Sequence, residues 1–327
     1  MAPNVPPTLP PAVPAEMPSK MAPETPPILP PRDAPAGAPG RASPGAASPG
    51  AALPGDPAPA FQAIAARRDG AVLHLTLNRP ESRNALSLAM VGELRAALAA
   101  AEASAAAGGG VRVIVLRGAG GHFCAGADLK DTAAARSRAA EQGQQALQDY
   151  NAEFGHLCGA YARSPLATVA VLEGAVMGGG FGLACAVDIA LAGSTVAFRL
   201  PETSLGVVPA QIAPYLIERI GIAQARRLAI SGVRVDGAGA LALGLVHELH
   251  AADQLDAALA RVLGEILQCA PGALAATKAL LAQSRYQPPA AMVEPAARVF
   301  AQAALGAEGV EGVLAFLQKR KPAWSPQ

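Results

Sequence analysis

The stretch Val169-Ala-Val-Leu-Glu-Gly-Ala-Val-Met-Gly-Gly-Gly-Phe-Gly-Leu-Ala-Cys-Ala-Val-Asp188 decides the fold. It begins with an apolar run typical of a buried strand, passes through three consecutive glycines, and continues with apolar residues at helical spacing. Gly178, Gly179 and Gly180 have no Cβ atoms, so a ligand can approach the backbone closely, and the first amides of the following helix lack intrahelical acceptors. The stretch therefore predicts a strand-to-helix turn that attracts negative charge.

Three interpretations of this turn are open on its own residues. No G-x-G-x-x-G register fits the glycines and no Gly-Lys-Ser/Thr sequence follows them, which disfavours a nucleotide pyrophosphate. A second interpretation is a packing turn that binds nothing. The third is an oxyanion hole, in which two backbone N–H groups stabilise a transient negative charge in a dry pocket.

The first sixty residues differ in composition from the rest. Nineteen of the 30 prolines lie between Met1 and Ala60, interleaved with Ala, Gly and Ser. Proline removes backbone donors, and the few large apolar side chains cannot offset the entropy cost of ordering the segment. We predict a disordered tail over residues 1–60, with a Pro-x-x-Pro docking role as an alternative and without the pattern of a signal peptide.

The composition excludes several classes of function. A net charge of +1 predicts no basic surface for nucleic acid, and no run of about 18 strongly apolar residues predicts a membrane span. The cysteines at 124, 158, 185 and 269 form no C-x-x-C pair, and the five histidines are scattered. Reduced thiols in a cytoplasmic protein, with no disulfide framework and no metal site, are therefore expected.

Apolar periodicity upstream of the glycines predicts alternating strands and helices. Residues 72–78 alternate leucines on one face, as a strand does, and Ser87 can cap a helix that ends in the glycines 108 to 110. The segment Val111–Arg117 is apolar on both faces, which is typical of a central strand covered by helices on both sides. A helical region over 132–162 and a strand over 168–172 follow.

A second glycine-rich loop, Gly118-Ala-Gly-Gly-His-Phe-Cys-Ala-Gly-Ala-Asp-Leu-Lys130, separates that central strand from the helical region. Both strand-to-helix turns end in small residues, so both can offer backbone amides at the same edge of one sheet. An oxyanion hole needs two such donors. Further on, Asp236 can cap one helix and Asp253 can cap a second helix that runs through Leu267. Pro271 suits the first turn of a third helix.

These motifs together resemble the enoyl-CoA hydratase/isomerase (crotonase) family. The resemblance covers essentially residues 63–322 and lies in the blocks Asn78-Arg-Pro with Asn84-Ala-Leu, Phe123-Cys-Ala-Gly-Ala-Asp-Leu-Lys130, the glycine run, Phe198-Arg-Leu-Pro-Glu-Thr-Ser-Leu-Gly206 and Glu311-Gly-Val-Leu-Ala-Phe-Leu-Gln-Lys-Arg-Lys-Pro322. It implies an α/β fold: a crotonase-like spiral of ββα units over residues 61–265, then a C-terminal helical trimerisation region over 266–327. The tail has no counterpart in the family.

The resemblance also implies the chemistry. Family members bind an acyl-CoA thioester and hold its oxygen with two backbone amides, which match Ala127 and Gly179. Coenzyme A is part of the substrate, and no separate cofactor or metal is implied. Glu202 matches the acid/base residue, whereas the position of the other glutamate found in hydratases is Gly182. This departure puts the two-glutamate mechanism in question.

Further residues match positions that bind the substrate. The block Pro209-Ala-Gln-Ile-Ala-Pro214 resembles the isohexenylglutaconyl-CoA hydratase-like branch, in which Gln211 can orient water or a substrate carboxylate. A homotrimer or a dimer of trimers is implied as well. The remaining expected contacts with the CoA ester are Asn84, Ala85, Ala125, Asp128, Lys130, Gly178, Phe316 and Lys319.

Three functions are compatible with these residues. A hydratase is favoured by the Gln211 block, and the product would be a 3-hydroxyacyl-CoA from a branched or carboxylated 2-enoyl-CoA. A double-bond isomerase needs only one carboxylate, which the chain retains at Glu202. A non-catalytic protein that binds CoA esters is the third.

Overall fold

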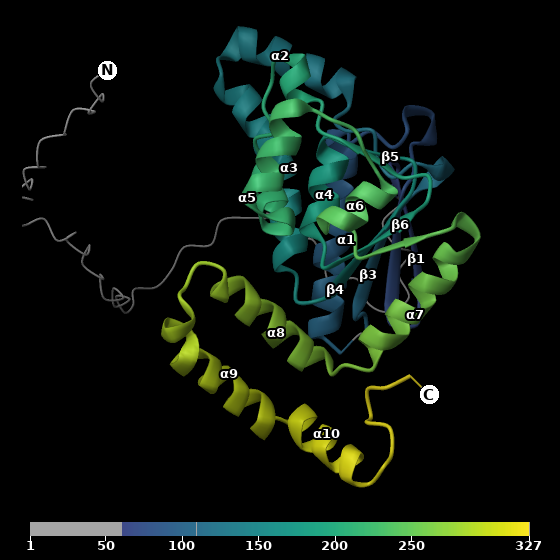
Figure 1. Ribbon diagram of the computed structural model, residues 1–327, viewed down its shortest axis with the longest axis vertical. Coiled ribbons are helices and arrows are strands. Elements are labelled where there is room, and N and C mark those ends of the chain that lie inside the picture. The colour runs from purple at the N-terminus through teal and green to yellow at the C-terminus, as the bar shows by residue number, and fades with distance from the viewer. Residues whose placement is uncertain (1–60, 109, 327) are drawn as a thin grey trace, which may run out of the picture. The chain divides into compact units, whose positions relative to one another are not determined.

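The computed structural model describes residues 61–108 and 110–326. The tail predicted over residues 1–60 lies outside the described residues. The described residues form one compact unit, built from two sheets and ten α-helices (Figure 1).

The larger sheet has six strands in the order β1-β2-β3-β4-β6-β9. β1 is antiparallel to β2, and every later neighbour is parallel. Their bounds are β1 Ile64–Asp69, β2 Val72–Leu77, β3 Val113–Gly118, β4 Ala167–Leu172, β6 Ile189–Gly193 and β9 Glu248–His250. The strand predicted over 72–78 and the central strand predicted over 111–117 are confirmed.

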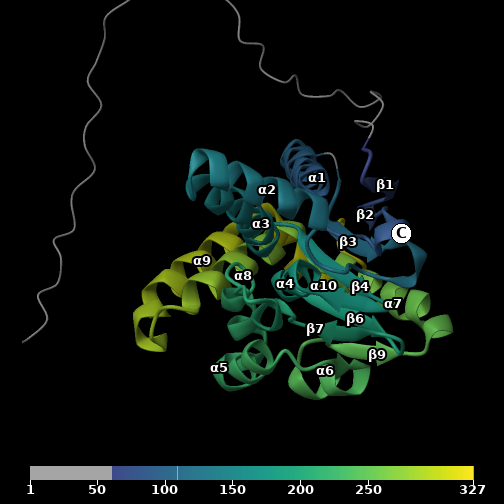
Figure 2. The same cartoon turned by 90° about the horizontal axis from the view of Figure 1, so that it is seen from above.

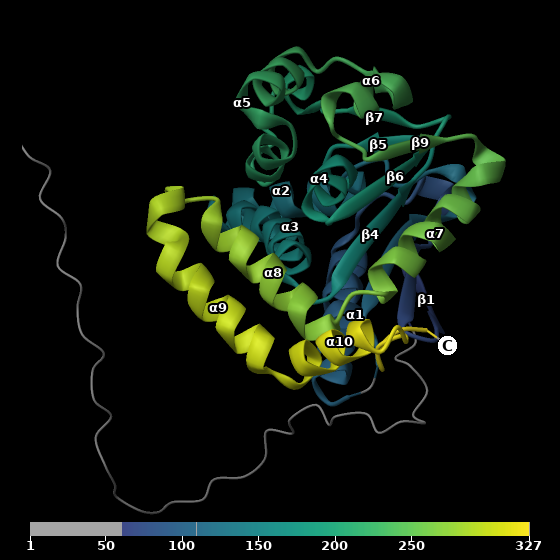
Figure 3. The ribbon, with the colours of Figure 1, turned by 60° about the horizontal axis from the view of Figure 1, so that its bottom comes forward.

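Helices cover both faces of this sheet, which explains why β3 is apolar on both sides. Val113 and Val115 pack in one apolar cluster with Leu259 of α7 (Leu255–Leu267). Ile114 and Leu116 point to the other face and share the main core with α1 (Leu88–Ala106), α3 (Gln145–Arg163) and α4 (Gly179–Ala186). Figure 3 shows α7 on one side of the sheet and α3 and α4 on the other.

The smaller sheet consists of β5 (Ala175–Met177), β7 (Ala197–Arg199) and β8 (Val235–Asp236) in that order. Because β4 and β5 belong to different sheets, the expectation that both glycine turns leave one sheet is wrong. Gly174, with φ of 53°, joins the two strands in a conformation that favours glycine. The chain thus moves from the first sheet to the second just before the glycine run.

Three of the four predicted helix starts are confirmed, and the start predicted at Asp253 is wrong. The Ser87 side chain accepts a hydrogen bond from the Met90 amide at 3.2 Å, Asp236 caps α6 (Gly237–Leu243), and α8 (Pro271–Ser284) begins at its proline. The helical region predicted over 132–162 is confirmed and consists of two helices, α2 (Leu129–Gln142) and α3, which are separated at Gly143 with φ of 92°. Asp253 does not cap α7, since it lies within a short 3₁₀ turn over 252–254.

The C-terminal part is helical, as expected. After α5 (Ala213–Ser231), α6 and α7, the helices α8, α9 (Val293–Leu305) and α10 (Ala307–Leu317) follow one another. α8 contacts α3, and Figure 2 shows α9 on the outer side of α8, away from the large sheet. No single described helix has the length and hydropathy of a membrane span. The segment Pro289–Leu305, which contains α9, and α10 together meet that length and hydropathy, but they meet at an angle of 65°.

Candidate active site

Two turns and one carboxylate converge at a single place. The first turn, residues 118–128, connects β3 to α2, and the second, at Gly178, connects β5 to α4. A Cβ atom added to Gly178 would lie 3.5 Å from the Cα atom of Gly126 and 3.0 Å from Oε1 of Glu202. The absence of side chains at both glycines lets the backbones meet beside the carboxylate.

Backbone hydrogen bonds fix the first turn against β5. The Cys124 amide donates to the Ala175 carbonyl at 2.9 Å, and the Met177 amide donates to the Cys124 carbonyl at 2.9 Å. The Phe123 amide also donates to the Glu173 carbonyl at 2.8 Å. The two turns, 50 residues apart in sequence, are therefore held in register by the second sheet rather than by the first.

The two amides expected to form an oxyanion hole lie on these turns. Ala127 is exposed, and its neighbours pair with Leu86, whose amide donates to the Gly126 carbonyl and whose carbonyl accepts from the Asp128 amide. Gly179 is the first residue of α4, where an amide has no intrahelical acceptor. In the part of the chain that the structure describes, neither the Ala127 nor the Gly179 amide has a hydrogen-bond partner. Two free donors at converging turns are what a negatively charged oxygen requires.

Glu202 stands at the start of a 3₁₀ turn that follows β7. Its Oε2 atom is buried and has no hydrogen-bond partner among residues 61–108 and 110–326. Burial raises the pKa of this carboxyl, and the hydrogen bond from its own backbone amide offsets only part of the effect. A partly buried carboxyl with a raised pKa and an unpartnered oxygen is suited to taking and returning a proton.

The position of the missing second glutamate is filled by other residues. A Cβ atom on Gly182 would lie 3.0 Å from Cγ1 of Ile212 and 3.1 Å from Cζ of Phe154. A Cβ atom on Gly179 would meet Cδ1 of Leu86 at 3.0 Å and the Phe154 ring at 3.5 Å. An apolar wall made by Phe154, Ile212 and Leu86 therefore flanks the site on this side.

Gln211 lies next to that wall but faces α3. Its Nε2 donates to Oδ1 of Asn151 at 3.0 Å, and its side chain lies against the backbone of Gly155. The amide is half-buried and keeps its oxygen for another donor. Asn151 and Phe154 were missed by sequence reasoning, since nothing in the spacing of α3 indicates which of its residues face the glycine run.

Asn84 and Asp128 hold the first turn in shape. Asn84 is fully buried; its Oδ1 accepts from the Arg79 amide at 2.9 Å, and its Nδ2 donates to the Ala119 and His122 carbonyls. Asp128 caps α2 and pairs with Nη1 of Arg79 at 2.8 Å. Burial acts to raise the pKa of Asp128, but hydrogen bonds from Arg79 and from the first α2 amides hold it below its usual value.

Arg79 connects these parts and was not predicted as a site residue. Besides Asp128, its Nη1 donates to the carbonyl of Ala85 at 2.8 Å. The motif Asn78-Arg-Pro was the only sequence signal for Arg79. Its hydrogen-bond partners lie up to 49 residues further along the chain, and the motif does not identify them. Ala125 on the first turn and Lys130 in the first turn of α2 are both exposed and remain available to a ligand.

Phe316 and Lys319 are not near this place in a single chain. The Phe316 side chain is 83% exposed on α10, and Lys319 follows that helix with φ of 54°. Figure 1 places α10 at one end of the compact unit and α2, which leaves the first turn, at the other. The structure thus does not bring these two predicted residues together with Glu202.

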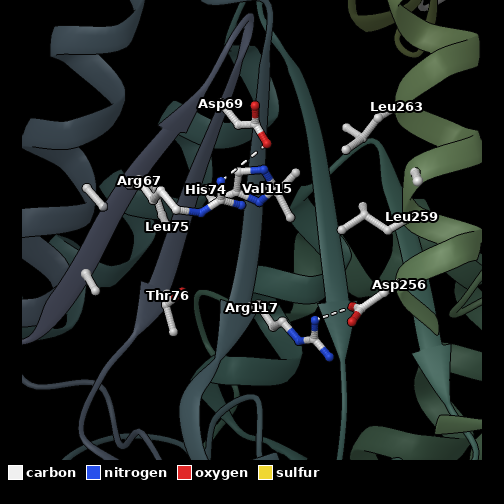
Figure 4. A pocket seen from close by; sticks show the side chains of 13 residues that line it. Arg67, Asp69, His74, Leu75, Thr76, Val115, Arg117, Asp256, Leu259 and Leu263 are labelled. Carbon is white, nitrogen blue, oxygen red and sulfur yellow. Dashed lines mark hydrogen bonds and ion pairs between the residues drawn. The ribbon is translucent and has the colours of Figure 1, made fainter. Parts of the chain in front are cut away.

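A separate cavity lies on the other face of the large sheet. It encloses about 620 Å³ between β1, β2, β3 and α7 and is lined by polar and apolar side chains (Figure 4). Arg117 pairs there with Asp256 at 2.5 Å, and burial lowers the pKa of His74. None of the predicted site residues lines this cavity, and no described cluster of three or more His, Cys, Asp or Glu side chains offers a metal site.

Comparison with known proteins agrees with the geometry. Residues 67–327 match the family model described as enoyl-CoA hydratase/isomerase. The 2,3-dehydroadipyl-CoA hydratase of Escherichia coli strain K12 is 34% identical over 262 residues, which cover 78% of this chain and 95% of that protein. The mevalonyl-coenzyme A hydratase of Aspergillus fumigatus is 32% identical over 263 residues, covering 78% of this chain and 92% of the relative.

Solved structures give the same result at higher identity. Pseudomonas aeruginosa AtuE is 53% identical with a TM-score of 0.77, covering 81% of this chain and 100% of its own. An enoyl-CoA hydratase/isomerase from Marinobacter aquaeolei is 47% identical with a TM-score of 0.77, covering 81% of this chain and 99% of its own. The chain therefore belongs to the enoyl-CoA hydratase/isomerase family of enzymes.

Proposed function

We propose that the protein adds water to a 2-enoyl-CoA thioester with one carboxylate, Glu202, and two backbone amides. The observation that carries the proposal is the unpartnered, buried Oε2 of Glu202 beside the point where Gly126 and Gly178 meet. An unsatisfied buried carboxyl oxygen is costly, so its retention is most simply explained by a function. The hydratases named among the relatives support the same reaction.

In the proposed step the thioester oxygen accepts hydrogen bonds from the Ala127 and Gly179 amides. Glu202 takes a proton from water as the water oxygen bonds to the β carbon, and the negative charge moves to the thioester oxygen. The protonated Glu202 then gives its proton to the α carbon, which restores the carboxylate. One water is consumed, nothing else is exchanged, and the step needs no cofactor beyond the CoA of the substrate. In this proposal the two amides supply the larger electrostatic term, because backbone donors held in place before the reaction need no reorganisation as charge develops.

The apolar wall suggests the class of acyl group. Phe154, Ile212 and Leu86 occupy the space beside Gly179 and Gly182, so a hydrocarbon part of the acyl chain fits there better than a polar one. The Pro209–Pro214 block supports a branched or carboxylated acyl group of the isohexenylglutaconyl-CoA kind, with Gln211 as the group that meets a polar end. The relatives named as 2,3-dehydroadipyl-CoA hydratase and mevalonyl-coenzyme A hydratase are compatible with this choice.

An isomerase is the second candidate, and Gly182 is the observation that favours it. A single carboxylate can remove a proton from one carbon and return it to another without water. Incubation of the purified protein with a panel of 2-enoyl- and 3-enoyl-CoA esters, followed by chromatographic separation of the isomers and mass spectrometry, tests both reactions. A mass gain of one water supports the hydratase; a panel on which neither reaction occurs but esters still bind contradicts both and supports the non-catalytic alternative.

We further propose that the protein acts as a trimer or as a dimer of trimers. The C-terminal helices expose large apolar side chains, among them Phe300 (74%), Leu305 (83%) and Phe316 (83%). A face of this kind is typical of a buried protein interface, and assembly would give Phe316 and Lys319 a neighbouring chain to contact. Sedimentation equilibrium measures the assembly, and a monomer at micromolar concentration would contradict it.

A cytoplasmic location is supported by the cysteines, which are all free among the described residues.

A further inference from the structure

Cys124 lies in the first of the two turns that carry the expected oxyanion amides, and its side chain packs against the second, at Gly180. Both its backbone N–H and its carbonyl form hydrogen bonds with β5, as described above, and its side chain is fully buried. Neither the proposed reaction nor the sequence motif gives this thiol a role. Its position, three residues before Ala127 and against the first turn of α4, gives it access to both halves of the site.

The sulfur contacts the residue next to each expected donor. The Gly126 amide, which precedes Ala127, donates to Sγ of Cys124 at 3.4 Å. A Cβ atom on Gly180, which follows Gly179, would lie 2.9 Å from the same sulfur and 2.5 Å from Cβ of Cys124. The Cys124 side chain therefore fills the gap that Gly180 leaves, and it touches both turns at once.

We propose that Cys124 is a positioning residue for the oxyanion hole: its thiol joins the Gly126 and Gly180 backbones and thereby fixes the directions of the Ala127 and Gly179 amides. This inference rests on the proposed function, in which these amides bind the thioester oxygen. Errors of a few tenths of an ångström in such donors lower the rate because electrostatic stabilisation depends on preorganised geometry.

The thiol is suited to this task because it stays neutral. Burial raises the pKa of Cys124 to about 12, although the backbone N–H groups of Gly126, Leu86 and Gly180 act in the opposite direction. A neutral sulfur accepts a weak hydrogen bond without adding a negative charge beside the oxygen that becomes negative. A thiolate at this place would oppose the reaction.

The experiment measures carbonyl polarisation and turnover together. Wild type, Cys124→Ala, Cys124→Val and Cys124→Ser are each saturated with butyryl-CoA that carries ¹³C at the thioester carbonyl, and the ¹³C chemical shift of the bound ester is compared with that of the free ester. Butyryl-CoA cannot be hydrated, so the readout does not depend on turnover. Values of kcat and KM are measured in parallel with a turned-over 2-enoyl-CoA. Cys158→Ala is the matched control, since Cys158 is equally buried but lies within α3 away from both turns.

Cys124→Ala and Cys124→Val are expected to move the carbonyl shift toward that of the free ester and to lower kcat about tenfold or more, with KM within about twofold. Cys124→Ser is expected to retain most of the carbonyl shift and of kcat, because the serine hydroxyl also donates and accepts hydrogen bonds. Cys158→Ala lowers the melting temperature but leaves shift and kcat near wild type. If Cys124→Ala does not fold, Cys124→Val still provides the test, because valine keeps the packing volume while removing the thiol.

Three outcomes overturn the inference or the function beneath it. If the Cys124 variants keep the wild-type carbonyl shift and kcat, the positioning role is wrong. If they lose both only as much as Cys158→Ala does, the thiol is a packing residue alone. If wild type itself does not shift the carbonyl of a bound ester, the oxyanion hole and the proposed function fail first, whatever the variants do.

Discussion

Oε1 of Glu202 lies 3.0 Å from the position that a Cβ atom on Gly178 would occupy. The carboxylate therefore leaves little room for a side chain at position 178, and Gly178 also has φ of 49°, a backbone conformation that strains other residues. The contact couples the placement of the acid/base group to the turn that presents the Gly179 amide.

Gly178→Ala is expected to displace the Glu202 carboxylate. We predict a fall in kcat, together with a loss of stability of about 1–3 kcal/mol from the backbone strain. The control is Gly206→Ala, because Gly206 has φ of 72° but a Cβ atom there meets nothing within 4 Å. If both variants lose stability and only Gly178→Ala loses turnover, the contact with Glu202 is the cause. Equal kcat values in the two variants would mean that the carboxylate position does not matter.

Glu202→Gln is expected to stabilise the protein at neutral pH. The pKa of Glu202 is raised in the folded state, so the folded protein binds the proton more tightly than the unfolded chain between the two pKa values. Its contribution to stability is therefore full at acid pH and is lost as pH rises through the folded pKa. Removing the charge should raise Tm at pH 7 to 8, and the difference from wild type should vanish below the usual glutamate pKa. Thermal melts across pH 4 to 8 measure this, and a lower Tm at pH 8 would show that the charged form is stabilised instead.

Gly179→Pro removes one expected oxyanion donor without breaking a helix. Gly179 is the first residue of α4, where proline is tolerated because that N–H has no intrahelical partner. We predict a loss of roughly 10²- to 10³-fold in kcat. Gly179→Ala, which keeps the N–H and meets only the end of the Leu86 side chain at 3.0 Å, should retain most of the activity. A folded Gly179→Pro enzyme with wild-type kcat would remove the oxyanion assignment.

Gly182→Glu does not restore a two-glutamate site, since Phe154 and Ile212 occupy the space. Overpacking of this kind costs about 1–3 kcal/mol, and a charged side chain against an apolar wall adds to that cost. We expect a lower Tm and no gain in hydration rate, with Tm partly recovered in Gly182→Glu/Phe154→Ala. A faster single variant with unchanged Tm would show that the wall yields easily.

The sequence predicted the parts of this architecture that depend on local pattern. The alternation in β2, the two apolar faces of β3, and the helix starts at Ser87, Asp236 and Pro271 all follow from side-chain period and capping chemistry. The second sheet could not be predicted, because the two residues of β8 become a strand only by pairing with Ala197 and Phe198. Asp253 shows the converse, since a residue with good capping chemistry lies one residue before the position that caps α7, Gln254.

The same division applies to the site. Motif order led to Glu202, Ala127 and Gly179, and the structure places all three on elements that converge. Phe154, Asn151 and Arg79 were missed because their importance comes from contacts between distant segments, such as α3 against the glycine run. Cys124 stood in a quoted motif, yet only the backbone on both sides of its sulfur shows what it contacts.

The most direct test of the account is the fate of solvent oxygen. Wild type and Glu202→Gln are incubated in H₂¹⁸O with a branched 2-enoyl-CoA and, separately, with a 3-enoyl-CoA, and products are separated by chromatography and identified by mass spectrometry. The account predicts ¹⁸O-labelled 3-hydroxyacyl-CoA from the 2-enoyl ester, with kcat reduced roughly 10²- to 10⁴-fold in Glu202→Gln. An unlabelled 2-enoyl product from the 3-enoyl ester, with no hydration of any 2-enoyl ester, or an unchanged rate in Glu202→Gln, would contradict it.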